Sequence, residues 1–297
     1  MPVVKSYRNG VTAGCAPRNK PHESAKRSTV GGWSKSSTRG NQTFLYSVDA
    51  PRLTGHGYAA TLTVRDSPPT SAEWHRIRRS VIEWLRRRGM VRLHWIIEWQ
   101  RRGAPHFHMA FWLPEPMSRD FFFEFLDYWR RLTAHLGTSI RSQHVTPIDN
   151  AKGWFEYVSK HAARGLSNYQ RNPERVPPEW QGKTGRMWGK LGDWPTDDEI
   201  RLDVGMKAYH RYRRLCRRWR IADARRAHRL AKTSETRRQA RRRITSARTM
   251  LACPDPKRSA VRGLSEWIPQ EVNLTLLTHA VGDGCARQEF DENPSAA

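Results

Sequence analysis

Apolar and polar residues alternate in four stretches of the middle of the chain. The clearest is VRLHWIIEWQ at 91–100, whose odd-numbered residues are all apolar and would lie on one face of a strand. A strand that buries one face in a core has this period of two. The same pattern predicts further strands at 57–66, 105–113 and 138–148. The polar turn between the second and third strands predicts a hairpin that turns near Arg102.

Apolar residues spaced three or four apart predict helices between these strands, at 70–89, 118–137 and 150–165. Thr70 or Ser71 can cap the first helix, and Gly89 can end it. The order is therefore β-α-β-β-α-β-α, whose first six elements match a ferredoxin-like split βαβ arrangement. We expect an α+β fold with an antiparallel sheet, helices on one face, and an open face suited to a site.

The two flanks of this region lack such periods. Residues 1–50 are rich in Ser, Gly, Thr, Lys and Arg, and we expect a disordered basic N-terminal segment there. The strands and helices predict one domain over about 51–200. A basic helical extension is expected at 201–250, and residues 251–297 give no clear signal and stay an unassigned tail.

The charge of the chain indicates its partner. The formal net charge is +25, from 53 Lys and Arg against 28 Asp and Glu, which favours a polyanion. Residues 206–250 concentrate the excess, with seventeen Lys or Arg and only Asp223 and Glu235 as acids. We expect this segment to bind nucleic-acid phosphates, although a solvated helix or a flexible tail is the alternative. Its candidate DNA-binding residues are Arg211, Arg213, Arg214, Arg217, Arg218 and Arg220.

Several other classes of protein do not fit the sequence. No apolar run approaches the length of a membrane-spanning helix, so no membrane partner is expected. The first residues, MPVVKSYRNG, lack the apolar core of a signal peptide, which predicts a cytoplasmic protein. The four cysteines are scattered and form no CxxC pair, which argues against a disulfide framework and a cysteine zinc site.

Three potential metal ligands converge in the predicted hairpin. His106 and His108 alternate with Phe107, so both imidazoles point to the face opposite the core. Glu98 lies roughly across from them on the preceding strand. Two imidazoles and a carboxylate can hold a divalent cation and leave positions open for substrate oxygens. This ligand set suits Mg, Mn, Zn or Fe; the alternative is that histidines at two alternate positions arose by chance.

The helix that follows the last predicted strand carries a candidate nucleophile. Tyr157 and Lys160 are three residues apart and are therefore neighbours on a helix. A tyrosine hydroxyl, with an ordinary pKa of about 10, is a poor nucleophile at neutral pH. It becomes effective when a metal polarises the phosphate and a nearby cation offsets the developing charge. The alternative for Tyr157 is an aromatic side chain packed on the sheet.

Three motifs together resemble the HUH endonucleases, in the branch of rolling-circle replication initiators (Rep proteins) of plasmids and filamentous phages. TLTVR at 61–65, PHFHM at 105–109 and YVSK at 157–160 are similar to the three Rep motifs and occur in the same order. The resemblance covers roughly residues 55–190 and makes 51–200 a nuclease domain. It implies that His106 and His108, with Glu98, bind Mg or Mn. It also implies that Tyr157 is the nucleophile and that Lys160 contacts the scissile phosphate or orients the metal and the tyrosine.

The implied activity is the nicking and rejoining of single-stranded DNA at a replication origin, through a 5′-phosphotyrosine link and a released 3′-hydroxyl. A host helicase and a host DNA polymerase are the further partners that this activity implies. A transposase or relaxase with the same chemistry is one alternative. A non-catalytic nucleic-acid-binding protein built on a ferredoxin-like sheet is another.

Overall fold

The chain forms two compact units. The computed structural model describes residues 1–15, 31–163, 170, 174, 176–248 and 263–282. The central unit comprises Ala25–Thr196, and the terminal unit joins Met1–Ser24 to Asp197–Ala297. This division differs from the predicted one, because the two flanks of the chain fold together rather than separately.

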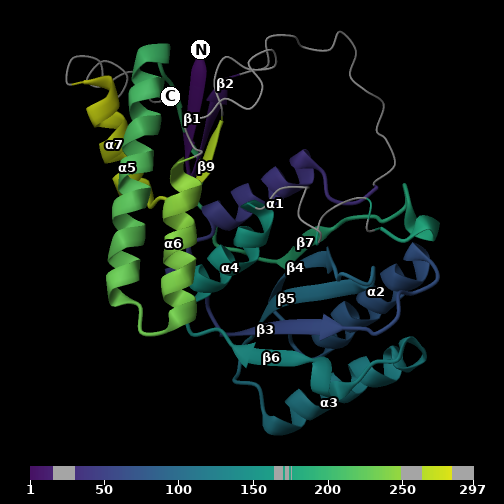
Figure 1. Cartoon of the computed structure of the whole chain (residues 1–297). Helices are drawn as coiled ribbons and strands as arrows, with labels where there is room; N and C mark the ends of the chain where they lie inside the picture. The colour runs from purple at the N-terminus through teal and green to yellow at the C-terminus, as the bar shows by residue number, and fades with distance from the viewer. Residues whose placement is uncertain (16–30, 164–169, 171–173, 175, 249–262, 283–297) are drawn as a thin grey trace, which may run out of the picture. The chain divides into compact units, whose positions relative to one another are not determined.

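The central unit contains the predicted antiparallel sheet. Its strands run in the order β6-β3-β5-β4-β7, with every neighbouring pair antiparallel (Figure 1). Their bounds are β3 His56–Thr63, β4 Arg92–Trp99, β5 Pro105–Leu113, β6 His144–Pro147 and β7 Trp188–Gly192. The first four in this list have the order of a ferredoxin-like split βαβ arrangement, as predicted. The edge strand β7, next to β4, was not predicted.

Helices α2 (Ser71–Arg87) and α3 (Arg119–Leu132) cover one face of this sheet. The Trp74 ring of α2 contacts Phe107 of β5 and Trp129 of α3, with ring centroids 6.0 and 6.3 Å apart. Thr70 caps α2, as its side chain accepts a hydrogen bond from the Glu73 backbone N–H at 3.2 Å. These contacts bury the aromatic residues that the alternation assigned to the core.

Two of the predicted helices lie on one face, and two further helices that the prediction did not place there partly cover the opposite face. Helix α1 (Lys35–Ser47) and helix α4 (Ala151–Ala163) lie there. Phe44 of α1 is 5.6 Å from the His94 ring, and Phe155 of α4 is 6.3 Å from the Trp112 ring, measured between centroids. Helix α1 falls within the segment predicted to be disordered. Its buried side chains lie almost consecutively near its C-terminal end, which gives no helical period in the sequence.

The terminal unit is a four-stranded antiparallel sheet with helices, in the order β8-β1-β2-β9. Its strands are β1 Pro2–Ser6, β2 Val11–Cys15, β8 Ile200–Asp203 and β9 Leu264–Glu266. Its helices are α5 Met206–Leu230, α6 Ser234–Arg248 and α7 Gln270–Val281. The basic helices were predicted correctly, but they belong to a folded unit instead of forming an extension. No helix in the described parts of the chain is long and apolar enough to cross a membrane.

Two predictions about the flanks are therefore corrected. Residues 1–15 are ordered strands and a turn rather than disordered, whereas 16–30 lie outside the described residues. Residues 251–297, to which the sequence assigned no structure, contribute β9 to the second sheet and α7 to its core. Strands of three to five residues carry too few alternating positions to stand out from a loop in the sequence.

Candidate functional site

The β4–β5 hairpin places Glu98 and both histidines on one face of the central sheet. Glu98 pairs directly with His106, and Ile96 with His108. Directly paired residues share a face, and so do residues two apart on one strand. The hairpin turns at Gly103, whose φ of 85° belongs to the left-handed region that favours glycine. The face predicted from alternation is therefore the observed one.

Glu98 and the two imidazoles lie close together on this face. Glu98 Oε2 is 3.6 Å from His108 Nε2, and the two imidazole centroids are 4.4 Å apart. Glu98 has 0% of its surface exposed and His108 has 5%, whereas His106 is partly exposed. Burying a carboxylate is costly unless a cation or a hydrogen-bond donor lies beside it. The arrangement thus places a buried carboxylate directly beside two imidazoles.

Two threonines of β3 contact the imidazoles from the neighbouring strand. Thr61 pairs with His108 and Thr63 with His106, and each Oγ1 lies 3.1 or 3.0 Å from the Nδ1 atom of its partner. A metal-binding histidine commonly uses one ring nitrogen for the ion and gives the hydrogen on the other to a nearby acceptor. Because the hydroxyls lie at Nδ1 in both rings, Nε2 is the nitrogen that each ring can offer to a shared ion.

Two glutamines brace the same group of side chains. Gln100 Nε2 lies 2.9 Å from His106 Nδ1, and its Oε1 is buried with no hydrogen-bond partner among the described residues. A half-turn of this amide would turn the oxygen to Nδ1 and let the imidazole donate there. Gln143 Oε1 accepts from the Thr63 N–H at 2.7 Å, and its Nε2 donates to the Thr63 carbonyl at 3.0 Å. Gln143 therefore fixes the end of β3 that carries Thr63.

His94 lies on the same face but is structural. Its Nε2 donates to Asn41 Oδ1 of α1 at 2.7 Å, and its surface is 1% exposed. Burial lowers the pKa of His94 to about 3, so this imidazole is neutral at physiological pH. Its position beneath α1 separates it from the hairpin end that carries Glu98, His106 and His108.

The chemistry of the three ligand candidates fits a divalent cation. One carboxylate oxygen and two neutral imidazoles suit first-row divalent ions such as Mn and leave coordination positions for phosphate oxygens. Within the described residues, no three His, Cys, Asp or Glu side chains stand in a ready-made arrangement for an ion. Binding one would therefore require Glu98, His106 and His108 to close on it by side-chain rotation.

Helix α4 carries the predicted nucleophile position across the face that bears the histidines. Phe155 and Val158 of α4 are buried, with 0% and 1% of their surfaces exposed, and Phe155 contacts Trp112. Trp112 lies on the histidine-bearing face of β5, by the alternation of that strand. Positions 157 and 160 belong to α4, but the side chains of Tyr157 and Lys160 lie outside the described residues.

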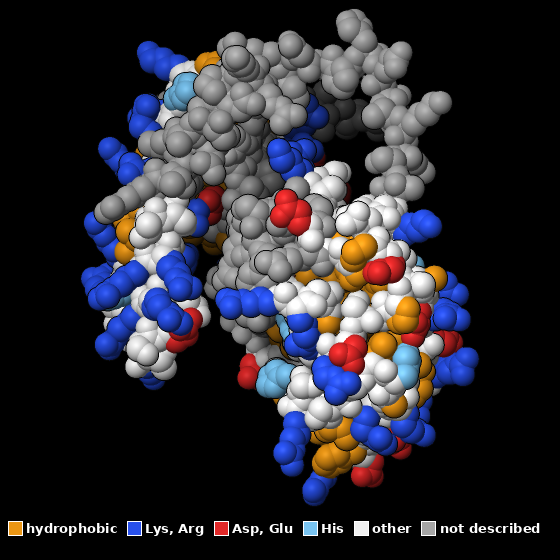
Figure 2. All heavy atoms as spheres, turned by 45° about the vertical axis from the view of Figure 1, so that its right-hand side comes forward, with side chains coloured by type: hydrophobic (Ala, Val, Ile, Leu, Met, Phe, Trp, Pro, Cys, Tyr) orange, Lys and Arg blue, Asp and Glu red, His pale blue; other side chains and the backbone are white. Residues whose placement is uncertain are grey.

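The six predicted DNA-binding arginines differ in their exposure and form three groups. Arg211, Arg214 and Arg218 are exposed on α5, where Lys and Arg side chains gather along the two basic helices (Figure 2). Arg217 and Arg220 are only partly exposed, and Arg220 pairs with Glu266 of β9. Arg213 is 3% exposed, which corrects its assignment as a phosphate contact. Its position lies on the inner side of α5, near Tyr209 and Tyr212.

The hydrogen-bond partners of the imidazoles were missed as functional residues, although a signal for them was present. Thr61 and Thr63 alternate in their strand with the same period as His106 and His108. In a ferredoxin-like sheet the first and third strands are neighbours, so these two pairs could have been predicted to face each other. Gln100 and Gln143 leave no such pattern, because they lie in connections outside the strands.

Comparison with known proteins gives one family and several full-length relatives. Residues 57–165 match the model of the family described as replication-associated protein ORF2/G2P. The chain is 44% identical over 279 residues to the replication-associated protein G2P of Pseudomonas phage Pf3, covering 93% of this chain and 96% of that one. It is 45% identical over 290 residues to a putative replication protein of Xylella fastidiosa strain 9a5c, covering 96% and 98%. No solved structure matches the chain significantly.

Proposed function

The chain belongs to the replication-associated protein ORF2/G2P family, and from that membership we propose that it initiates rolling-circle replication by nicking and rejoining single-stranded DNA at an origin. The observation that carries the proposal is the convergence of Glu98, His106 and His108 on one sheet face. The helix that contains position 157 crosses the same face. A phosphate held between them would meet ligands from the sheet and a nucleophile from the helix.

Each residue has a defined part in this reaction. The Tyr157 hydroxyl gives its proton to solvent, and its oxygen attacks the phosphorus of a phosphodiester. A 5′-phosphotyrosine bond forms while the bond to the 3′-oxygen breaks, and that oxygen takes up a proton as a free 3′-hydroxyl. Lys160 offsets the negative charge that develops on the phosphate. Glu98, His106 and His108 would hold Mg or Mn, which supplies Lewis-acid polarisation of the phosphate when bound.

The phosphotyrosine bond retains the energy of the broken phosphodiester. A later 3′-hydroxyl can therefore attack it and close a DNA circle, which suits a replication initiator. A host polymerase would extend the first 3′-hydroxyl, and a host helicase would open the duplex ahead of it. A transposase or relaxase could use the same chemistry, but the relatives described above carry names that refer to replication.

A non-catalytic binding module is the rival from another class. Ferredoxin-like nucleic-acid-binding sheets expose aromatic side chains on which bases stack. On the corresponding face of β4 and β5, this chain has Glu98, His106 and His108 together, and Glu98 is fully buried. That composition favours metal-assisted phosphoryl chemistry over base stacking.

A covalent-capture experiment tests the proposal. The protein is incubated with Mn or Mg and labelled single-stranded DNA that carries the origin, and the products are separated under denaturing conditions. We expect a protein–DNA adduct that Tyr157→Phe abolishes. Tyr128→Phe is the matched control, because it removes a phenolic oxygen from α3, where that hydroxyl donates to the Ser80 carbonyl. Absence of an adduct with every origin fragment would favour the binding module.

A second variant separates metal binding from folding. His106→Ala should abolish cleavage while salt-sensitive DNA binding and the melting temperature stay close to those of the unchanged protein. Simultaneous loss of cleavage, DNA binding and cooperative melting would mean that His106 maintains the fold instead of holding a cation.

A further inference from the structure

One side of α5 carries a straight row of cations. Six of them follow one another at intervals of four, three, four, seven and four residues, which keeps them on one side of a helix. We call this row the α5 stripe: Lys207, Arg211, Arg214, Arg218, Arg225 and Arg229. All six side chains are exposed. Three of them were among the predicted DNA-binding residues, and the other three extend the row to both ends of the helix.

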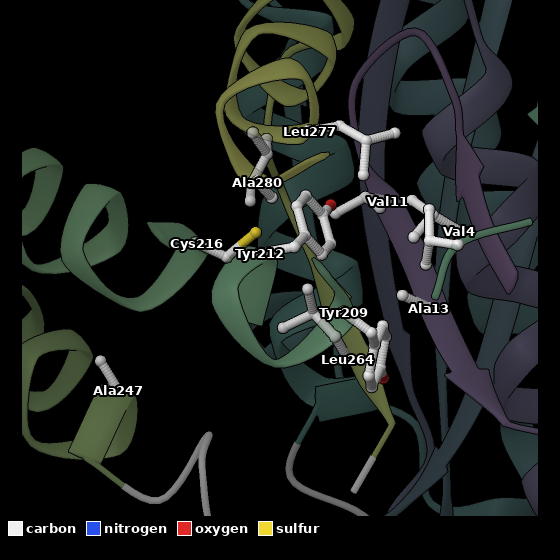
Figure 3. Packing of buried hydrophobic residues seen from close by; sticks show 12 residues of the cluster. Val4, Val11, Ala13, Tyr209, Tyr212, Cys216, Ala247, Leu264, Leu277 and Ala280 are labelled. Atoms are coloured by element: carbon white, nitrogen blue, oxygen red, sulfur yellow. The ribbon is translucent and has the colours of Figure 1, made fainter. Parts of the chain in front are cut away.

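The opposite side of α5 is locked into the core of the terminal unit. Tyr209, Tyr212 and Cys216 are fully buried, and Figure 3 shows them beside residues of β1, β2, β9 and α7. Ala224 continues this buried side towards the second half of the helix. Since these residues fix the rotation of α5 about its axis, the stripe is held facing outward.

Three acids close to α5 and α6 pair with arginines that do not belong to the stripe. Asp223 pairs with Arg226 and with Arg243 of α6. Glu266 of β9 pairs with Arg220, and Glu235 of α6 pairs with Arg238. In the part of the chain that the structure describes, none of the six stripe cations is paired with a carboxylate. Their charges are thus available to an external polyanion.

We propose that the α5 stripe binds the phosphate backbone of double-stranded DNA over about one helical turn, without regard to sequence. Lys207 and Arg229 are 22 positions apart, which corresponds to about 33 Å along an α-helix. One turn of B-form DNA spans about 34–36 Å. Because both the helix and the duplex are stiff, binding between them would cost little conformational entropy. The inference rests on the proposed function only for the identity of the partner as DNA.

The composition of the exposed side favours a duplex over two other polyanions. Single-strand sites add aromatic side chains on which bases stack, but Tyr209 and Tyr212 are buried on the inner side. Membrane-surface helices need an exposed apolar face. The exposed large hydrophobic residues of α5 are Met206 and Leu230, at its two ends and outside the stripe.

Salt-dependent titration of a labelled duplex tests the proposal. Arg211, Arg218 and Arg225 are replaced together by Gln, which lowers the net charge of +25 by three. The matched control replaces Arg76, Arg79 and Arg86 of α2, also exposed, by Gln with the same change in charge. A third protein carries Lys at the three stripe positions. All are titrated by fluorescence anisotropy between about 50 and 200 mM salt, a range over which phosphate-dominated binding changes strongly. EDTA is present so that binding is read without cleavage.

The expected result is specific to the stripe. Each lost phosphate contact removes about 0.9 from the slope of log affinity against log salt, so the Gln variant should be shallower by roughly 2 to 3. The α2 control and the Lys variant should keep the original slope. Circular dichroism should show that all three variants fold, because Gln and Lys both favour exposed helical positions.

Three results would overturn the proposal. The first is an unchanged slope in the Gln variant, and the second is an equal loss in the α2 control, which would indicate a net-charge effect. The third is a larger loss for a single strand of the same length, or for vesicles containing phosphatidylserine, than for the duplex. Failure of the proposed nicking function would appear separately, as the absence of a covalent adduct. The salt dependence of duplex binding could still be compared among the variants in that case.

Discussion

The threonine hydroxyls next to the imidazoles make a quantitative prediction about metal binding. Thr61→Val keeps the shape of the side chain but removes the Oγ1 that lies 3.1 Å from His108 Nδ1. A neutral hydrogen bond contributes a net ~0.5–1.5 kcal/mol. Since 1.4 kcal/mol is about a factor of ten, the affinity for Mn should fall by roughly 2- to 12-fold. Thr63→Val removes the corresponding contact to His106, at 3.0 Å.

The double variant Thr61→Val/Thr63→Val should lose more Mn affinity than either single variant. If both contacts act independently, their effects sum to about 1–3 kcal/mol, or roughly 5- to 150-fold. Removing the hydrogen-bond partners of metal-bound histidines typically costs about 10–100-fold in metal affinity. The two sites are adjacent, so a departure from additivity would measure the coupling between the two imidazoles.

The assay is titration with Mn followed by electron paramagnetic resonance, with calorimetry as a second measurement. Thr61→Ser should bind Mn like the unchanged protein, because it restores the hydroxyl. Thr146→Val is the matched control: Thr146 pairs with Ala59 on the same face, away from the imidazoles. Nitrogen-15 spectra of the histidines without metal provide a readout independent of activity. We expect the Nδ1–H tautomer of His108 in the unchanged protein and a shift towards Nε2–H in Thr61→Val.

Two results would refute this reasoning. One is an Mn affinity that Thr61→Val and Thr63→Val leave unchanged while His106→Ala abolishes it, because the hydroxyls would then have no part in orienting the ligands. The other is an equal loss in Thr146→Val, which would indicate a general effect of the substitution on the sheet. If the unchanged protein binds no Mn, the proposed metal site fails as a whole, whereas the tautomer comparison still tests the threonines.

Three further predictions concern stability and reactivity. The buried His94 has a pKa of about 3, whereas an unfolded histidine has one of about 6.5, so the unfolded chain binds one more proton than the folded chain between these pH values. The free energy of unfolding, measured by urea titration, should therefore fall by about 2 kcal/mol from pH 7 to pH 5. His94→Gln should remove this contribution to the pH dependence. Gly192→Ala would place a Cβ against the Val91 carbonyl oxygen at a φ of 77°, so thermal melting should show a loss of about 1–3 kcal/mol in the free energy of unfolding. Gly31→Ala is the control, because the atoms nearest to its added Cβ are 3.8 Å away. It should change the free energy of unfolding by no more than about 0.5 kcal/mol. Burial raises the pKa of the Cys216 thiol to about 12, so mass spectrometry should find it unalkylated at pH 8 in the native protein and alkylated in urea.

The centre of the fold was predictable because its elements are long and strongly patterned. Strand β4 alternates over eight residues, and α2 combines an apolar stripe with a cap at Thr70 and Gly89 after its end. Local propensity, period and turn chemistry all favour the same arrangement there, which is the condition under which a sequence specifies a structure clearly. The predicted hairpin placed Glu98 roughly across from His106 or His108, and the observed register pairs it with His106.

The edges of the fold were not predictable for a different reason. Strand β1 has five residues; one partner, β2, follows it directly, whereas the other, β8, lies far along the sequence at residues 200–203. The pairing of β1 with β8 therefore depends on contacts between residues nearly two hundred positions apart, which no local pattern reports. Helix α1 is stabilised mainly by tertiary packing of Phe44 and Leu45, and its own sequence favours a helix only weakly.

The closure of the terminal unit by both ends of the chain determines how its basic helices can be studied. Deleting residues from 206 onward would remove α5, α6, β9 and α7 together. Val4 and Val11, both fully buried, would then lose Tyr209, Tyr212 and Leu277 from their core. Uncovering large apolar side chains costs several kcal/mol in total, which is comparable with the whole stability of a small domain. A truncated protein that failed to bind DNA would report unfolding as readily as lost charge. Substitutions confined to the outward side of α5 leave that core intact, so they isolate the contribution of the cations.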